Sequence, residues 1–231
     1  MKKNTFEGFI SKYNLGGEVE SVKINSTDEN LLVSFISDDK TLLGSVSSDN
    51  KEFPNGDFGI YTTSKLKGLL GVLDSNIEIN QTDASLVFSD KNTSVNYMLA
   101  DLSVIPAVPD LKQLPTFETS ITLDGEFIST FIKSKSALSE SDTFTFSCKD
   151  GKGEIVLGYQ KINSNRISIT VGCTCDGDVD PISFSAKYLK EILSSNKGAK
   201  ASHLKISSQG LAHVYFENGG YKSNYYLVEI K

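Results

Sequence analysis

The two histidines, His203 and His213, fall in two neighbouring predicted strands of a hairpin, and the chain has no others. Neither has a cysteine or a carboxylate at the short spacing that metal sites use, so we interpret both as ordinary strand residues. The sequence also contains no phosphate-binding loop, dinucleotide-binding fingerprint, nucleophile elbow or zinc-protease helix. It therefore predicts no catalytic centre, no metal site and no cofactor, and we expect the protein not to be an enzyme.

A short acidic segment resembles the opening of a calcium-binding loop. Asp176, Asp178 and Asp180 alternate as the first ligands of such a loop do. The sixth position is Pro181 where the loop needs glycine, and the twelfth is Lys187 where it needs glutamate. We interpret the segment as a solvated acidic turn.

Three cysteines, Cys148, Cys173 and Cys175, are odd in number and form no C-x-x-C pair. This pattern predicts reduced thiols of a cytosolic protein instead of a disulfide framework, with the last two packed on one face of a strand. No apolar run approaches the roughly 20 residues of a membrane span, and the first residues lack the apolar stretch expected of a signal peptide. We expect a cytoplasmic protein, in the host cytoplasm if it is viral, with no membrane partner.

Lysines provide the remaining chemistry, because an ammonium group can contact phosphates without reading bases. The net charge of −6 disfavours a nucleic-acid partner at first sight. However, four predicted helical windows, 1–14, 63–75, 124–138 and 184–200, hold 11 lysines against 5 acidic residues. The remaining 12 basic and 24 acidic residues leave an acidic body. A single lysine on a polar helix face is usually only solvated, so the repetition carries the argument.

The helix that positions two of these lysines follows from its leucines. Four leucines recur at i, i+3, i+4 and i+7 within residues 66–73, which predicts one apolar helix stripe flanked by Lys65 and Lys67. The segment 61–70 aligns with 184–193, and Phe-Ile-Ser at 9–11 recurs at 127–129. The closing strands 96–100 and 225–229 are also similar. These three pairs of similar segments occur in the same order in both halves, which indicates a duplicated unit of roughly 115 residues.

Short alternating segments surround two predicted helices in each half, which indicates an α+β fold with antiparallel sheets. We predict a first domain over 1–103, a connector over 104–115 and a second domain over 116–231. The connector holds three of the five prolines and is apolar for a linker. It either packs across the domains or contributes to a docking surface.

Four segments carry a resemblance to a known family: 57–61 running into 66–73, then 152–156, and the ending 224–229. In these segments, as in its length and duplication, the chain resembles the DNA sliding clamps, most closely the trimeric clamps of T-even-type bacteriophages. The resemblance implies a DNA-clamp fold and a head-to-tail homotrimeric ring whose helices surround double-stranded DNA. It also implies docking of DNA polymerase and of a clamp loader ATPase in an apolar groove between the domains.

Together, the helical pattern and the resemblance select two sets of residues. The candidate DNA-facing lysines are Lys12, Lys65, Lys67, Lys133, Lys187 and Lys190. The candidates for the partner-peptide groove are Val104, Ile105, Leu111, Leu114, Tyr226 and Val228, which could instead only seal the domain interface. The resemblance further implies that strand 94–101 of one subunit pairs with strand 165–172 of its neighbour.

Two other functions remain open for a duplicated β-rich chain. The main alternative is a non-enzymatic phage structural protein, which would show no dependence on DNA topology. A small-ligand-binding β-protein would be a stable monomer with an enclosed pocket.

Overall fold

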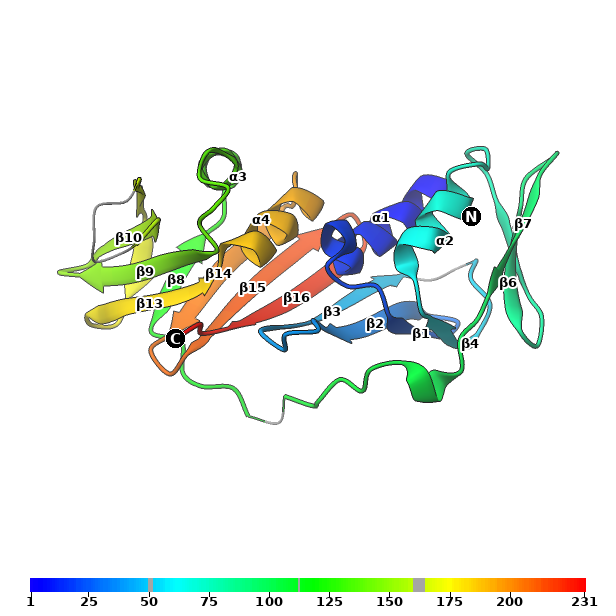
Figure 1. The fold of residues 1–231 in the computed structure, drawn as a ribbon, viewed down its shortest axis with the longest axis horizontal. Helices are drawn as coiled ribbons and strands as arrows, with labels where there is room; N and C mark the ends of the chain where they lie inside the picture. The colour runs from blue at the N-terminus through cyan, green and yellow to red at the C-terminus, as the bar shows by residue number, and fades with distance from the viewer. Residues whose placement is uncertain (50–51, 112, 160–164) are drawn as a thin grey trace. The chain divides into compact units, whose positions relative to one another are not determined.

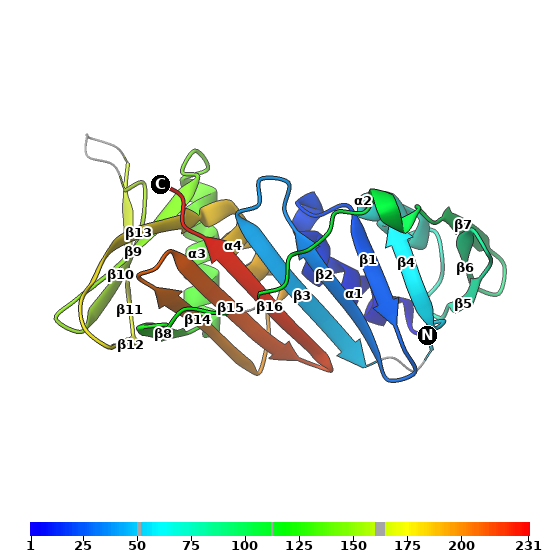
Figure 2. The same cartoon turned by 90° about the horizontal axis from the view of Figure 1, so that it is seen from below.

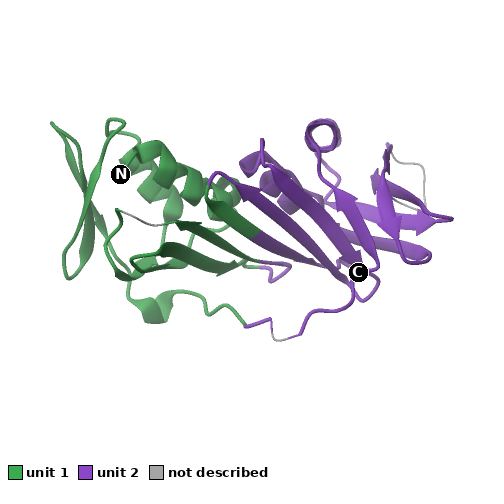
Figure 3. Ribbon diagram, turned by 180° about the vertical axis from the view of Figure 1, so that it is seen from behind, with its two compact units in different colours: residues 1–38, 44–109, 220–223 green, residues 39–43, 110–219, 224–231 purple. Residues whose placement is uncertain are grey.

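The computed structural model describes residues 1–49, 52–111, 113–159 and 165–231, which form two compact units (Figure 3). Unit 1 comprises residues 1–38, 44–109 and 220–223, and unit 2 comprises residues 39–43, 110–219 and 224–231. Residue 112 of the predicted connector lies outside the described residues, as does residue 160, the last residue of a strand that the sequence predicts over 153–160. The described helices include none that is long and apolar enough to cross a membrane.

Unit 1 contains two helices and two groups of antiparallel strands (Figure 1). The helices are α1 (Lys3–Asn14) and α2 (Thr63–Leu70), with 3-10 turns at Leu15–Gly17 and Leu102–Val104. The strands are β1 (Val22–Ser26), β2 (Asn30–Ile36), β3 (Leu42–Asp49), β4 (Gly56–Ile60), β5 (Glu78–Gln81), β6 (Ser85–Ser89) and β7 (Ser94–Met98). The first four pair in the order β4-β1-β2-β3, and the last three form a meander in the order β5-β6-β7.

Unit 2 also contains two helices and two groups of strands. The helices are α3 (Gly125–Ala137) and α4 (Ala186–Ser195). The strands are β8 (Thr119–Thr122), β9 (Thr143–Lys149), β10 (Lys152–Leu157), β11 (Ile167–Val171), β12 (Cys173–Cys175), β13 (Val179–Ser185), β14 (Ala201–Ser207), β15 (Leu211–Asn218) and β16 (Tyr221–Val228). They pair in the orders β11-β10-β9-β13 and β12-β8-β14-β15-β16.

The two units repeat one topology. In each, a helix, α1 or α3, precedes four strands that pair in the order fourth, first, second, third. In unit 2 these four are β9, β10, β11 and β13, while β8 before α3 and β12 after β11 are additional strands. A second helix, α2 or α4, then leads to a three-stranded meander. The predicted duplication and the predicted α+β class with two helices per half on antiparallel sheets are confirmed. The predicted domain boundaries stay a prediction.

The helices of unit 1 form because their apolar residues share one face. Leu66 and Leu70 of α2 are fully buried, and Leu73 just beyond the helix is 3% exposed, whereas Lys65 faces solvent. In α1, Phe6 is buried and its ring packs 5.2 Å from Phe53 and 5.8 Å from Phe88. Figure 1 shows both helices on one face of β1–β4, and each turns its apolar stripe away from solvent.

Unit 2 is built around a chain of aromatic rings. The Phe131 ring of α3 lies 5.7 Å from Phe144 of β9, which lies 5.7 Å from Phe184 of β13. The first turn of α3 is capped by Asp124, whose Oδ1 accepts a 2.7 Å hydrogen bond from the Phe127 amide. Ser185 caps α4 in the same way. These caps and rings fix where each helix starts and which face it buries.

Candidate nucleic-acid interface and partner groove

Helix α2 presents one of its two predicted lysines fully to solvent. Lys65 is exposed, while Lys67 is half-buried and its ammonium donates to Asn14 Oδ1 at 3.3 Å. The helix start is held by Glu20, whose carboxylate accepts hydrogen bonds from the Ser64 amide, at 2.8 Å, and from the Ser64 hydroxyl. A carboxylate at a helix N-terminus is also favoured by the helix dipole. The position of Lys65 is therefore well defined at the backbone.

Lys12 differs from the other predicted DNA-facing lysines because it is buried. Its side chain is only 5% exposed, and its ammonium lies 5.1 Å from the centroid of the Tyr221 ring. Tyr221 is fixed there by a 2.7 Å hydrogen bond from its hydroxyl to the Thr5 carbonyl. Burial lowers the pKa of Lys12. This lysine packs inside unit 1 and offers no charge to a ligand at the surface.

Unit 2 presents two of its three predicted lysines fully to solvent. Lys133 of α3 and Lys187 of α4 are exposed. Lys190 is half-buried, and its ammonium lies 3.9 Å from the carboxylate of Glu191. Such a long ion pair contributes little to stability, but the carboxylate offsets the positive charge that a phosphate would meet.

Other lysines of the basic windows divide between structural and solvated positions. The ammonium of Lys3 donates to the Leu73 carbonyl at 2.5 Å, and that of Lys135 donates to the Ser139 carbonyl at 2.7 Å. Lys2, Lys197 and Lys200 are exposed. These three lysines add to Lys65, Lys133 and Lys187 as accessible charges. Counting charges along the sequence could not distinguish them from Lys3 and Lys135, whose ammonium groups donate to carbonyls.

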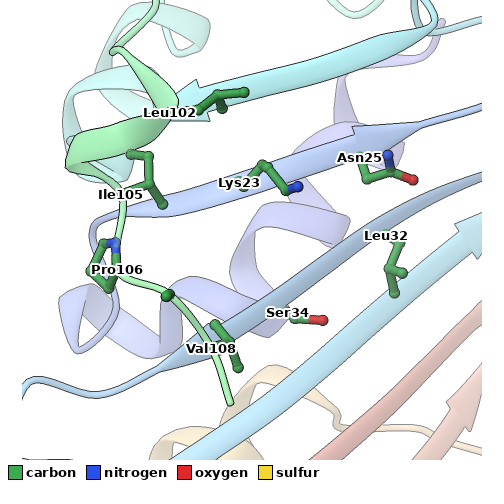
Figure 4. Close-up of a pocket in the computed structure, with 9 residues that line it drawn as sticks. Lys23, Asn25, Leu32, Ser34, Leu102, Ile105, Pro106 and Val108 are labelled. Atoms are coloured by element: carbon green, nitrogen blue, oxygen red, sulfur yellow. The ribbon is translucent and has the colours of Figure 1, made fainter. Parts of the chain in front are cut away.

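An apolar groove lies on the opposite face of unit 1 from its helices. The segment that follows β7 crosses over β1 and β2 (Figure 2), and it encloses a cavity of about 480 Å³ with them (Figure 4). We call this cavity the connector groove. Its lining residues are Lys23, Asn25, Leu32, Ser34, Leu102, Ile105, Pro106, Ala107 and Val108. The helix face and the connector groove of unit 1 can thus serve two ligands at once.

The rim of the connector groove carries a fixed carboxylate. Asn25 donates a 2.7 Å hydrogen bond to Asp57, and the Lys23 ammonium lies 3.4 Å from the same carboxylate. The hydrogen bond from Asn25 and the charge of Lys23 hold the pKa of Asp57 below its usual value. The groove therefore combines apolar connector side chains with a polar strand edge, the pattern of a site that orients a short segment.

The six predicted groove residues do not share one cavity. Ile105 lines the connector groove, and Val104 lines a neighbouring cavity of about 410 Å³. Leu114 belongs to unit 2 and lines another cavity there, and Leu111 of the same unit is 44% exposed. Of the two β16 residues, Val228 is half-buried, and the Tyr226 ring stacks 4.6 Å from His213.

Sequence reasoning missed the strand residues that complete the connector groove. Leu32 is 38% exposed on β2. Elsewhere in this strand the buried residues are apolar and the exposed residues are polar. An apolar residue on the polar face of a strand was the available signal. Lys23, Asn25 and Ser34 are ordinary solvent-facing strand residues, and no sequence signal marks them.

The prediction of three reduced cysteines is wrong. Cys148 of β9 and Cys175 of β12 are joined by a disulfide, and Cys173 is the free thiol. The sulfur of Cys173 lies 3.2 Å from that of Cys175. Cys175 is on β12, which pairs with β8 and belongs to a different strand group from β9. The sequence spacing of 27 residues gave no sign of this contact.

The two histidines lie in a row of rings on β14–β16 of unit 2. The His203 ring stacks 5.2 Å from Tyr215, and His213 Nε2 lies 3.0 Å from Asn224 Oδ1. Burial lowers the pKa of His203 to about 4 and also lowers that of His213. Both rings pack as strand residues.

Comparisons with solved structures identify the fold of the chain. The chain superposes on the crystal structure of proliferating cellular nuclear antigen (PCNA) from Entamoeba histolytica with a TM-score of 0.76 and 17% identity, covering 100% of this chain and 96% of that one. It superposes on A. fulgidus PCNA, solved with the C-terminal region of FEN-1 bound, with a TM-score of 0.78 and 16% identity, covering 100% and 97%. No family model and no curated protein sequence matches the chain. The predicted clamp fold is confirmed over the whole chain.

Proposed function

We propose that the chain is a sliding clamp, a non-catalytic subunit that encircles double-stranded DNA and tethers a replicative DNA polymerase. The observation that carries this proposal is the repeated unit, which places exposed lysines on helices in both halves of a clamp-like fold. As in the resemblance to phage clamps, we propose a homotrimer. The clamp loader ATPase is the partner that would open such a ring.

The lysines suit sliding better than sequence-specific binding. The chain has a single arginine, Arg166, so its basic surfaces consist almost entirely of lysine. A lysine ammonium is a hydrated point charge that meets a phosphate without the fixed bidentate geometry of arginine. Contacts of this kind are individually weak and screened by salt. A ring would retain DNA by enclosing it, so weak contacts leave it free to move.

Two strands with open edges could close the ring. Among the described residues, β7 ends the strand order of its meander in unit 1, and β11 ends that of its sheet in unit 2. These strands lie within the segments 94–101 and 165–172 that the family resemblance pairs between neighbours. An unpaired edge offers backbone N–H and C=O groups to another chain. Head-to-tail pairing of two different edges generates a closed ring when the rotation between neighbouring subunits closes.

The connector groove is the proposed docking site for partner peptides. A. fulgidus PCNA is described as bound to the C-terminal region of FEN-1, which supports a peptide-binding role for a similar fold. In this chain the groove offers the apolar side chains of Ile105 and Val108 from the connector and Leu32 from β2. Polymerase and clamp loader would each insert a short apolar segment there.

The ring can be tested through the outward edge of β7. The Leu99 amide donates to the Ala84 carbonyl at 2.9 Å, so in this ladder Tyr97 and Leu99 point their N–H groups towards β6 and Asn96 points its N–H away. Asn96→Pro removes only the outward donor and should convert a trimer into monomers, whereas Asn96→Ala should stay trimeric. The mass in solution is measured by light scattering at several concentrations.

The outcome separates the proposal from its alternatives. A trimer for the unmodified chain and the Asn96→Ala variant, with monomers for Asn96→Pro, supports the ring. A monomer at every concentration for the unmodified chain would favour a ligand-binding β-protein and contradict the clamp. Assembly that Asn96→Pro leaves intact would place the contact elsewhere and favour a structural protein.

A further inference from the structure

The three cysteines converge in unit 2, where the chain passes from one strand group to the other. Strand β11 belongs to the group β11-β10-β9-β13, and β12, which begins one residue later, belongs to the group that contains β8 and β14. This step places Cys173 and Cys175 beside Cys148 of β9. The three sulfur atoms all lie within 4.8 Å of one another.

The cluster holds three sulfurs close to the spacing that a tetrahedral metal ion requires. Zinc–thiolate bonds are about 2.3 Å long, so two thiolates on one tetrahedral zinc lie roughly 3.8 Å apart. In the oxidised chain the bonded pair, Cys148 and Cys175, is closer than this value, and Cys173 lies 3.2 Å from Cys175. All three sulfurs lie within 4.8 Å of one another, so reduction has only to let the bonded pair separate for an ion to enter. The Cα atoms of Cys148 and Cys175 are 7.0 Å apart, beyond the roughly 4.4–6.8 Å of ordinary disulfides. A bridging ion suits this wider separation.

The surroundings of the cluster are those of a site built for sulfur. A Cβ added to Gly153 would lie 2.5 Å from the Cys173 sulfur, so only glycine leaves room for this side chain. The Gly153 amide donates to Cys173, and the Thr119 hydroxyl donates to the Cys175 sulfur at 3.6 Å. Hydrogen bonds of this kind orient thiolate ligands and spread their negative charge.

We propose that Cys148, Cys173 and Cys175 form a binding site for one thiophilic divalent cation, Zn²⁺, when the disulfide is reduced. Cys148 is 1% exposed, whereas Cys173 and Cys175 are half-buried, so the fourth position of the ion faces solvent and takes a water molecule. The ion fastens β12 to β9 and so ties the two strand groups of unit 2 together.

The disulfide and the metal are alternative states of the same sulfurs. A thiol or phosphine reductant supplies two electrons, and two protons are taken up as the bond between Cys148 and Cys175 breaks. Binding of Zn²⁺ then releases three protons, one from each thiol, as three metal–sulfur bonds form. Oxidation of the pair removes two ligands and releases the ion.

The test is a titration of the full-length chain with Co²⁺, a spectroscopic substitute for Zn²⁺, after reduction with a phosphine. We expect a thiolate-to-cobalt charge-transfer band that saturates at one ion per chain with the intensity of three sulfur ligands. Zn²⁺ should abolish the band by displacement. Oxidised protein should show no band. Absence of the band in reduced protein, or an intensity below three thiolates, overturns the proposal.

Two variants and one independent measurement locate the site. Cys173→Ser should lose the three-sulfur band, whereas Thr174→Ala, which changes the exposed residue between the two cysteines, should keep it. A band unchanged in Cys173→Ser overturns the assignment. Mass spectrometry after alkylation of the native reduced chain gives a readout without variants, because one equivalent of Zn²⁺ should protect all three cysteines. Equal alkylation with and without Zn²⁺ also overturns it.

Discussion

The second helices of the two units, α2 and α4, start from the same sequence pattern and use it differently. Leu66 of α2 and Leu189 of α4 occupy matching positions and are both fully buried. The matching lysines, Lys67 and Lys190, are both half-buried, but the first donates to a buried asparagine and the second lies beside Glu191. The repeat thus preserves the buried face closely and the charged face only loosely.

This difference shows what a helical pattern determines. Burying a leucine side chain stabilises the fold by roughly 1.5–3 kcal/mol, so positions facing the sheet tolerate little change. An ion pair formed by a lysine on the exposed face adds little to the stability of the fold. Helices of equal pattern can therefore carry different numbers of accessible charges, and we expect the two units to contribute unequally to DNA binding.

The largest effect should come from the feature that the two helices share. Leu66→Ala and Leu189→Ala each leave a cavity in a fully buried position and should lower the free energy of unfolding by about 3 kcal/mol. Chemical denaturation of each variant measures the loss. A cost near zero in one unit would show that its helix is not packed as the structure has it, and would break the equivalence of the two units.

The charged faces should differ in DNA binding. Lys65→Glu combined with Lys187→Glu reverses two exposed charges, one in each unit, and should weaken association with double-stranded DNA about tenfold at low salt. Lys190→Glu should have a smaller effect than Lys187→Glu, because Glu191 already offsets its charge. Binding measured across a salt series tests both, with melting temperature as the control. Equal effects of Lys190→Glu and Lys187→Glu would contradict the screening of Lys190 by Glu191.

Lys12 provides the matched contrast on α1. Lys12→Met keeps the buried stem and removes the ammonium over Tyr221, which should change stability by about 1 kcal/mol. DNA association should stay at the level of the unmodified chain, because this side chain is 5% exposed. A loss of DNA binding without a change in stability would return Lys12 to the interface.

The last prediction concerns how stability depends on pH, and it involves groups of unit 2 alone. The pKa of His203 is about 4 in the folded chain because burial disfavours its charged form, against 6.5 in the unfolded chain. Between these values the unfolded chain binds a proton that the folded chain does not, so the melting temperature should fall as pH is lowered from 6.5 towards 4. His203→Gln should reduce this slope. Part of the slope should remain in this variant, because the pKa of His213 is also lowered. An unchanged slope in the variant would contradict the assignment.

Local patterns predicted the elements of this fold well. The leucine stripe of α2 and the segment 186–195 of α4 were readable because helix periodicity and burial act within a few residues. The hairpin between β6 and β7 also has a local cause, because the Asp90 carboxylate accepts hydrogen bonds from the amides of Asn92 and Thr93. In each case the sequence signal and its physical cause are local.

The failures involve contacts between distant segments. Lys12 is covered by the ring of Tyr221, 209 positions later, and the residues around Lys12 give no signal for this contact. Cys148 meets Cys175 although β9 and β12 belong to different strand groups, so no predicted strand pairing brings them together. The apolar connector was recognised, but its partner strands were not, because Leu32 differs from a core residue only in the face it occupies. Side-chain accessibility depends on such pairings, so the candidate site was predicted less completely than the fold.

The central claim, that the chain holds DNA by enclosing it, is tested most directly by changing DNA topology alone. The chain is cross-linked at concentrations where rings open and close spontaneously, in the presence of either nicked circular DNA or the same DNA linearised, and is then denatured. We predict that protein stays with the circular DNA and is released when that DNA is cut, while linear DNA retains none. Equal retention on both forms, or none on either, would contradict encirclement.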